Sequence, residues 1–330
     1  MAKRKNGQIF AKDVIFALLA MFLIISALIF VFQKPMVCDL PTFAVSDLNG
    51  LTVYEHGQKS LHLHTSNYSQ IEWSPDGRYI AFSVLSEDMR SSDVYILNVE
   101  TTSLTKVNVI SGRFNLDPKW SPDGRYIAFT RDYGSTTEQT AVPEIWIYDT
   151  HEPHINSYVG GSANFDSYDW DPVTGSLFYS VGELLYQYYP QTGVYLESAT
   201  DPIGFFDLQF SASGRYLAWF SGTTLTIKNI EAQGAPLHWD SSSTPLLYLS
   251  PDEGLIFYDD SNGIVEQSRK EGVHFNHFVG FSPDWSPDGQ IMSIQTELGT
   301  YQFYRYNDEE LDYVPLCGME LEGAVLEFRP

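Results

Sequence analysis

The chain has 330 residues, 43% of them hydrophobic and 18% charged, so it can bury a large core and disorder is excluded as its main state. Its 24 glycines, 17 prolines, 21 tyrosines and 21 phenylalanines favour many short strands joined by tight turns over a helical bundle. Residues 35–330 hold 14 basic and 41 acidic residues, a net charge of −27, which argues against binding to nucleic acid or to an anionic membrane surface.

An uncharged run of nineteen residues, VIFALLAMFLIISALIFVF, occupies positions 14–32. As a helix it spans about 28 Å, which matches the core of a bilayer. The run is longer than the roughly 7 to 15 apolar residues of a cleaved signal peptide, and no small-x-small cleavage site follows it. We therefore predict an uncleaved transmembrane signal anchor at 14–32, followed by a linker at 33–41. A cleaved signal peptide, or a lipoprotein acylated at Cys38, is the alternative.

The charges around this run predict its orientation. The basic residues are Lys3, Arg4, Lys5 and Lys12 before it and Lys34 after it. The positive-inside rule keeps residues 1–13 in the cytoplasm and exports the remainder. We expect a single-pass protein of the cell membrane with an extracytoplasmic domain.

An internal repeat dominates the exported part. The segments 73–82 and 120–129 both read WSPDGRYIAF, and degenerate copies begin at Trp170, Phe210, Leu249 and Trp285. Successive copies start 36 to 50 residues apart, a period typical of propeller blades. In each copy Ser-Pro-Asp-Gly favours a tight turn between two strands, and further alternating segments follow. Four antiparallel strands per period predict an all-β fold, a β-propeller.

At these residues the chain resembles the TolB-like family of WD-like propeller repeats, whose unit carries W-S-P-D-G-x-x-I-A-F. The resemblance covers about residues 42–330. It implies the propeller fold and no particular activity, because the motif builds a turn and a strand and is not itself a site.

The two ends of this domain predict how the propeller closes. Leu326-Glu327-Phe328-Arg329-Pro330 is similar to the first strand of another copy, and residues 42–64 contain three further strand-like segments. We predict that 322–330 pairs with 42–64 to complete a composite blade, because an open sheet would leave unpaired edges. The domain 42–330 then has about seven blades, and six is the alternative.

Motifs for catalysis are missing. The sequence contains no G-x-S-x-G, P-loop, G-x-G-x-x-G or H-E-x-x-H motif. We therefore expect a protein that is not an enzyme and that carries no cofactor. Of the histidine pairs, His274 and His277 form the better metal candidate, but solvated loop histidines are the simpler interpretation, so no metal is expected.

The two cysteines, Cys38 and Cys317, leave two readings open. An exported domain permits a disulfide. Strand geometry places the two residues near opposite faces of the propeller, and only a mobile linker at 35–41 could bring them together, so separate thiols are favoured.

Partner binding is expected on the face opposite the Ser-Pro-Asp-Gly turns. Two long connections, 86–92 and 131–143, lie there with the loops between blades, and long loops on a rigid scaffold often carry recognition. The candidate residues are Glu87, Asp88, Arg90, Arg113, Asp117, Arg131, Asp132, Tyr133, Glu138 and His277. The resulting hypothesis is a membrane-tethered binding or scaffold module of the cell envelope with a protein or envelope-polymer partner. The alternative is a lyase-like or hydrolase-like enzyme that uses channel residues on polysaccharide or peptide.

Overall fold

The computed structural model divides the chain into two compact units, residues 1–39 and residues 40–330. It describes residues 38–47, 50–64, 68–107, 114–132, 143–152, 156–161, 165–201, 203–232, 235–240, 247–251, 255–260, 263–268, 277–278, 281–297, 300–307, 312–321 and 325–330. The predicted basic tail (1–13) and anchor (14–32) lie outside these residues. Within the described ranges, no helix has the length and hydropathy needed to cross a membrane.

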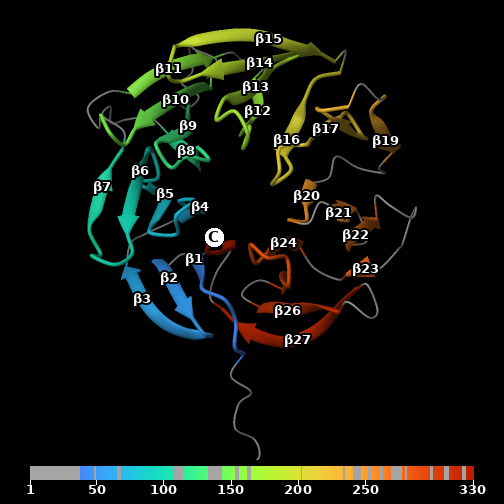
Figure 1. Cartoon of the computed structure of the whole chain (residues 1–330). Coiled ribbons are helices and arrows are strands. Elements are labelled where there is room, and N and C mark those ends of the chain that lie inside the picture. Colours follow the sequence, from blue (N-terminus) through green and yellow to red (C-terminus); the bar gives the residue numbers. More distant parts are fainter. Residues whose placement is uncertain are drawn as a thin grey trace, which may run out of the picture. The chain divides into compact units, whose positions relative to one another are not determined.

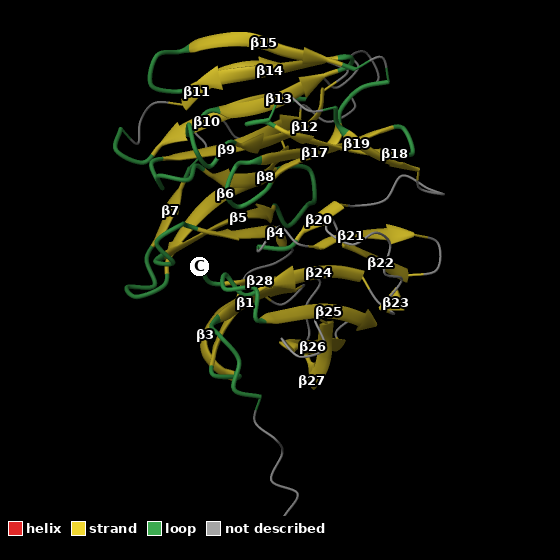
Figure 2. Ribbon diagram, turned by 45° about the vertical axis from the view of Figure 1, so that its right-hand side comes forward, coloured by secondary structure: helices red, strands yellow, loops and turns green. Residues whose placement is uncertain are grey.

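The second unit is a β-propeller. Its described strands form seven four-stranded antiparallel sheets, arranged as blades around a central axis in Figure 1. Figure 2 shows the blades as strands joined by loops. The first four sheets are β28 (Val325–Phe328), β1 (Phe43–Asp47), β2 (Gly50–Glu55), β3 (Gln58–His64); β4 (Tyr68–Trp73), β5 (Tyr79–Leu85), β6 (Ser92–Asn98), β7 (Leu104–Lys106); β8 (Phe114–Trp120), β9 (Tyr126–Asp132), β10 (Glu144–Asp149), β11 (Asn156–Gly161); and β12 (Phe165–Trp170), β13 (Leu177–Val181), β14 (Leu184–Tyr189), β15 (Val194–Thr200). The other three are β16 (Phe206–Phe210), β17 (Tyr216–Ser221), β18 (Thr224–Asn229), β19 (Leu237–Asp240); β20 (Leu247–Leu249), β21 (Leu255–Asp260), β22 (Gly263–Ser268), β23 (His277–Phe278); and β24 (Phe281–Trp285), β25 (Ile291–Glu297), β26 (Thr300–Asn307), β27 (Asp312–Glu320).

The first repeat copy folds as its sequence predicts. In the first copy the backbone N–H of Ser74 donates to Tyr79 O at 2.8 Å, and Gly77 N donates to Ser74 O at 2.8 Å. Gly77 has φ +65°, a conformation that glycine adopts without steric cost. The next strand alternates across the sheet, and Ile80 and Phe82 enter a buried cluster with Trp73. The turn and the strand after it are therefore local consequences of the repeat.

The predicted composite blade is confirmed. β28 pairs with β1 in antiparallel register, with Phe43 opposite Phe328 and Val45 opposite Leu326. Phe43 is fully buried and contacts Phe328 and Phe303 edge-on or tilted, with ring centroids 5.9 and 5.7 Å apart. The last strand of the chain therefore joins the first to close the propeller.

The innermost strands carry a bulge that the repeat does not reveal. Their pairing with the second strand shifts register three residues before the aromatic that ends the strand. Non-glycine residues with positive φ occupy this position in four blades: Gln70 (+38°), Asp117 (+54°), Asp207 (+48°) and Ser282 (+47°). The bulge increases the local twist and changes the direction of the side chains that follow it.

Both cysteines are disulfide-bonded in the structure, and because the sequence contains two, Cys38 and Cys317 are bonded to each other. This outcome corrects the placement that favoured separate thiols. Cys317 lies inside β27, opposite Phe303, and not beyond its end, while residues 38–42 precede the first strand. The strand-length argument between opposite faces therefore does not apply.

Candidate functional site

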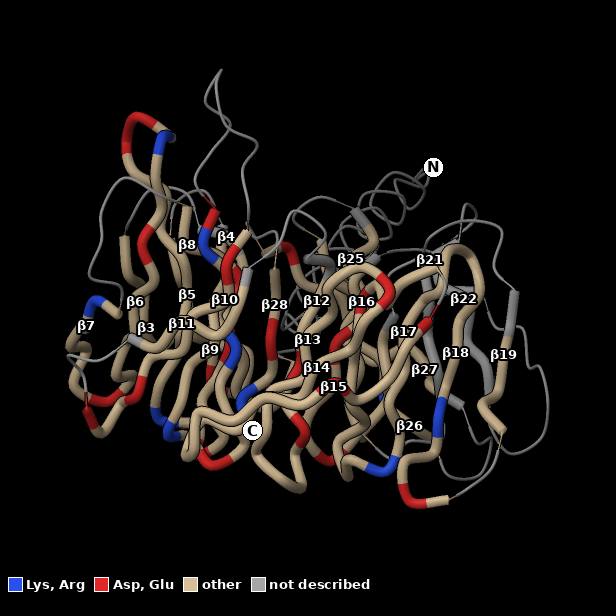
Figure 3. The backbone as a smooth tube through the Cα atoms, turned by 90° about the horizontal axis from the view of Figure 1, so that it is seen from above, with Lys and Arg blue, Asp and Glu red and all other residues tan. Residues whose placement is uncertain are grey.

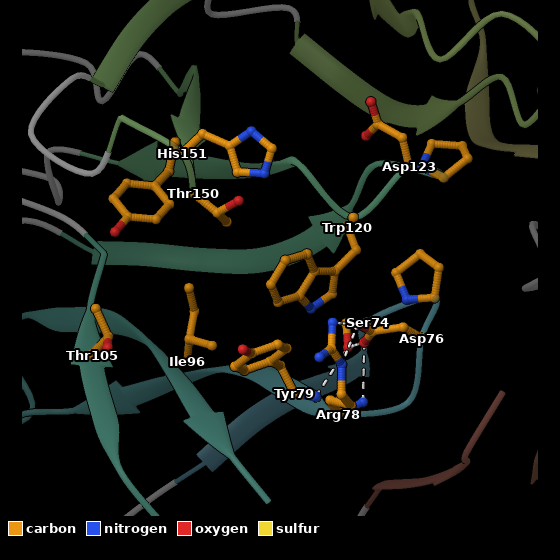
Figure 4. Close-up of a pocket in the computed structure, with 14 residues that line it drawn as sticks. Ser74, Asp76, Arg78, Tyr79, Ile96, Thr105, Trp120, Asp123, Thr150 and His151 are labelled. Carbon is orange, nitrogen blue, oxygen red and sulfur yellow. Dashed lines mark hydrogen bonds and ion pairs between the residues drawn. The ribbon is translucent and has the colours of Figure 1, made fainter.

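A cleft of about 700 Å³ opens between the two blades that contain the identical decapeptides, β4–β7 and β8–β11. Its lining combines both Ser-Pro-Asp-Gly turns with residues of β6, β7 and β10 and the two residues that follow β10, as Figure 4 shows. The lining includes Pro75, Asp76, Arg78, Tyr79, Ile96, Thr105, Trp120, Pro122, Asp123, Tyr148, Thr150 and His151. The volume is in the range of ligand-binding clefts.

Aromatic side chains form one wall of the cleft. The rings of Tyr79 and Trp120 lie 6.3 Å apart and are tilted by 35°, and Figure 4 shows the indole facing Tyr79. Tyr148, which lies in β10, is 3% exposed. Burial raises the pKa of Tyr148, so its phenol stays protonated at neutral pH. Trp120 is 6% exposed and Tyr79 is partly exposed, so Tyr79 supplies most of the aromatic surface that the cleft presents.

The indole of Trp120 distinguishes this blade interface from its neighbours. The indole N–H of Trp73 donates to Glu327 O at 3.2 Å, and that of Trp170 donates to Lys119 O at 3.0 Å. The buried Nε1 of Trp120 has no hydrogen-bond partner, which costs about 1–3 kcal/mol. The indole N–H at the interface that opens into the cleft therefore lacks the hydrogen bond that the indole makes at the other two interfaces.

The two turns at the mouth of the cleft have the same sequence but different ion pairs. Arg78 pairs with Asp76 of its own turn, with Nε 2.6 Å from Oδ2. Arg125, the matching arginine, instead donates from Nη2 to Asp149 Oδ2 at 2.7 Å. Arg125 and Asp149 line a neighbouring pocket of about 290 Å³ and not the cleft.

The acid in the second turn is left with neutral donors. Asp123 accepts hydrogen bonds from Ser121 Oγ at 2.6 Å and from the backbone N–H of Arg125 at 3.0 Å. Among the described residues, no cationic side chain forms an ion pair with Asp123. The mouth of the cleft therefore carries one neutralised carboxylate and one carboxylate without a cation.

A single residue accounts for this difference. Asp149 pairs with Tyr126 across β9 and β10, and in the preceding blade Asn98 pairs with Tyr79 at the same position. Because Asn98 has no charge, Arg78 has no acid to reach there and turns to Asp76. The hydrogen bonds from Ser74 and Arg78 lower the pKa of Asp76, although partial burial acts in the opposite direction. In the same way, Arg125 and the N–H of His151 lower the pKa of Asp149 against its burial.

A second group of charged residues lines the centre of the propeller, at the position before the aromatic that ends the innermost strand in five of the seven described sheets. The carboxylates there accept backbone N–H bonds from the next blade: Glu327 from Trp73 at 3.1 Å, Glu72 from Trp120 at 3.1 Å, Asp169 from Phe210 at 2.8 Å and Asp284 from Phe328 at 2.9 Å. Lys119 occupies this position in its blade and donates from Nζ to Tyr168 O at 3.0 Å. We name these five side chains the interblade clasp.

Burial raises the pKa of three carboxyl groups of the clasp. It raises the pKa of Asp284 to about 7, against the opposing hydrogen bonds from Phe328 and Trp285. It also raises the pKa of Glu72 and Glu327 well above the usual range. Burial alone would lower the pKa of Lys119, but the combined charge of Asp169, Asp117 and Glu72 raises it. No cluster of metal-ligating side chains was found in the described ranges.

The sequence-predicted loop residues are dispersed. Arg113, Tyr133 and Glu138 lie outside the described residues, and the structure describes only the backbone of His277, in β23. Glu87, Asp88 and Arg90 are exposed in the connection between β5 and β6, which Figure 3 shows at the edge of the propeller opposite the C-terminus. Asp88 accepts a hydrogen bond from Ser86 Oγ at 2.7 Å.

Four of the predicted residues, His277 in β23 among them, lie in strands and not in loops, which corrects their expected placement. Arg131 and Asp132 end β9. Arg131 is 3% exposed and its guanidinium lies 5.0 Å from the centroid of the Trp146 ring, so it cannot serve as an exposed anchor. Asp117 forms the bulge of β8, where its carbonyl accepts a hydrogen bond from the Tyr168 hydroxyl.

Sequence reasoning missed the cleft because it treated the repeated turns as structural. The signal was nevertheless present: two adjacent copies supply Tyr79 and Trp120 at fixed offsets, and Asn98 differs from Asp149 at matching positions. The sequence alone does not show that these residues meet across a blade interface.

Solved structures share the fold at low sequence identity. A candidate 6-phosphogluconolactonase from Bacteroides fragilis is 12% identical, with a TM-score of 0.60 and 90% of this chain and 99% of that chain covered. The β-propeller domain of Cps50 (Swd1) from Myceliophteria thermophila is 12% identical, with a TM-score of 0.58 and coverage of 80% and 93%. A chain of the mitotic checkpoint complex is 13% identical, with a TM-score of 0.54 and coverage of 76% and 77%. No protein-family model and no curated protein matches the sequence. These likenesses show that residues 40–330 form a β-propeller.

Proposed function

We propose that the protein is a membrane-tethered, extracytoplasmic β-propeller that binds a protein partner of the cell envelope. The observation that carries the proposal is the cleft between β4–β7 and β8–β11, with its aromatic wall and charged mouth. One structure of similar fold belongs to a mitotic checkpoint complex, which agrees with a binding role.

Two features support the tether and the location. The uncharged run at 14–32 has its basic residues mainly on the N-terminal side, which favours export of the propeller. The disulfide between Cys38 and Cys317 suits an oxidising compartment outside the cytoplasm.

Binding is favoured over catalysis because the described clasp carboxylates already have structural roles. Glu72, Asp169, Asp284 and Glu327 each accept a backbone N–H from the following blade. A structural role therefore accounts for the burial of these four carboxylates without a catalytic one.

Photo-crosslinking with the full chain in its own membrane tests the site. A photoreactive amino acid placed at Thr105 or His151 lies in the cleft, and one placed at Met89, 61% exposed, lies in the connection between β5 and β6. We expect a protein adduct from the two cleft positions and none from Met89. Adducts from Met89 alone would move the site to the loop face that the sequence favoured, and a lack of adducts at all three positions would contradict protein binding.

Protease protection in intact cells tests the topology. We expect residues 1–13 to be protected and the propeller to be cleaved once the outer face is opened, because the charge asymmetry around 14–32 predicts a cytoplasmic N-terminus. The reverse pattern would refute the proposed location.

A further inference from the structure

We infer that the cleft binds an extended, positively charged peptide segment, with a lysine or arginine side chain of that segment placed at Asp123. The inference rests on the proposed function and adds the chemical class of the bound segment. It starts from the two turns at the mouth of the cleft, which share one sequence and differ in charge balance.

The first step is the position of negative charge. The Asp76 carboxylate is bound by Arg78, whereas Arg125 turns away from Asp123 and pairs with Asp149. The Asp123 carboxylate therefore faces the cleft mouth with only neutral donors, Ser121 Oγ and a backbone N–H. A cationic side chain from a ligand would supply the ion pair that Arg78 supplies in the neighbouring turn.

The second step is the aromatic wall. The partly exposed ring of Tyr79 lies 6.3 Å from the ring of Trp120 and tilted to it, and the mostly buried rings of Trp120 and Tyr148 line the same cleft. Ring faces attract the alkyl stem and the charge of lysine or arginine, as well as the flat apolar surface of proline. The hydroxyls of Thr105 and Thr150 also line the cleft, beside the aromatic side chains.

The third step excludes anionic ligands. The arginine in the lining, Arg78, is already paired, and the exported part of the chain carries a net charge of −27. Long-range attraction therefore favours a cationic partner and repels phosphate-rich ones. A neutral glycan, which aromatic rings also suit, is distinguished by experiment.

Affinity measurements on the purified full chain in detergent test the inference. The probes are three blocked nonapeptides, (Pro-Pro-Lys)₃, (Pro-Pro-Gln)₃ and (Pro-Pro-Glu)₃, which stay extended because of their prolines, and a chitohexaose as the neutral glycan. We expect the lysine peptide to bind tightest and its affinity to fall as salt rises. Equal affinity for the lysine and glutamine peptides, or tighter binding of the glycan, would overturn the inference.

Three variants locate the charge. D123N removes the free carboxylate, and D149N reproduces the pattern at Asn98, so Arg125 should turn to Asp123. Both should weaken the lysine peptide about three- to fivefold, as exposed ion pairs typically do. N98D should draw Arg78 away from Asp76 and strengthen binding by about the same factor. An unchanged affinity in D123N, or a weaker one in N98D, would contradict the assignment.

The two proposals fail in different ways. Partner adducts from His151 without binding of the lysine peptide would keep the proposed function and overturn the ligand class. Binding of the lysine peptide with the expected variant pattern, but partner adducts from Met89 only, would support the ligand class and overturn the cleft as the partner site. The thermal midpoint of each variant shows whether the fold is retained, and D123N, at an exposed turn, provides the comparison if D149N unfolds.

Discussion

The residue before the aromatic of each repeat has a role that its chemistry alone does not suggest. A buried carboxylate in a soluble domain often marks a catalytic group. Here Glu72, Asp169, Asp284 and Glu327 accept N–H groups from the next blade and so satisfy backbone donors at the centre of the propeller. Burial at this structural joint raises the pKa of Glu72, Asp284 and Glu327.

Asp284 makes stability depend on pH. Its pKa is about 7 in the folded protein and about 3.9 in an unfolded chain. Between these values only the folded state binds the proton, so raising the pH from about 4 to 7 lowers the free energy of unfolding. We expect Asp284→Asn, which keeps an acceptor for Phe328 N, to be about 1–3 kcal/mol more stable than the wild type at pH 8 and equal to it near pH 4. This free-energy difference is smaller than the whole pKa shift would give, because the Asp284 side chain is only partly buried.

Urea unfolding at pH 4, 6 and 8 measures this effect. Glu320→Gln, at an exposed position of β27, is the matched control and should show no such trend. A constant difference between Asp284→Asn and wild type at all three pH values would contradict the assignment.

Ser282 tests the bulge of the innermost strands. Its φ of +47° is in the left-handed region and its side chain is exposed, so few contacts are lost on substitution. We expect Ser282→Gly to raise the free energy of unfolding by up to about 1 kcal/mol, and Ser282→Val to lower it by about 1–2 kcal/mol. Thermal unfolding measures both variants, and equal midpoints for glycine and valine would show that the backbone is not constrained there.

At the scale of elements, the last strand closes the propeller. β28 supplies backbone pairing to β1, the Glu327 carboxylate to Trp73 N and the Phe328 ring to the cluster around Phe43. These contacts connect the end of the chain to its first two blades. Closure through a composite blade removes the two open edges that an incomplete blade would expose.

Deletion of residues 322–330 should therefore unfold or aggregate the domain, because β1 loses its inner neighbour and Phe43 its contact with Phe328. Size-exclusion chromatography and thermal unfolding measure the outcome. Deletion of Pro330 alone, which leaves β28 intact, is the control and should retain the wild-type midpoint. An unchanged midpoint in the long deletion would show that closure does not depend on β28.

At the scale of the whole molecule, the charge and the disulfide bear on where the protein works. The net charge of −27 on residues 35–330 disfavours anionic partners, and the bond between Cys38 and Cys317 links the chain ahead of β1 to β27. A maleimide reagent of high mass should therefore not label the protein isolated from cells under denaturing conditions, and should add twice after reduction. Labelling of two cysteines without a reductant would contradict both the bond and an oxidising location.

The repeat and the Ser-Pro-Asp-Gly turns were predictable from the sequence, because turn chemistry and strand alternation act between residues close in the chain. The matching of Leu326–Pro330 to Ile71–Pro75 predicted the pairing now observed between β28 and β1. The partners of side chains were not predictable. The two identical decapeptides fold alike, yet Arg78 and Arg125 form different ion pairs. The difference lies in a residue from a later strand, which is Asn98 near Arg78 and Asp149 near Arg125. Only the tertiary structure brings those strands, and the cleft between the blades, to the repeated turns.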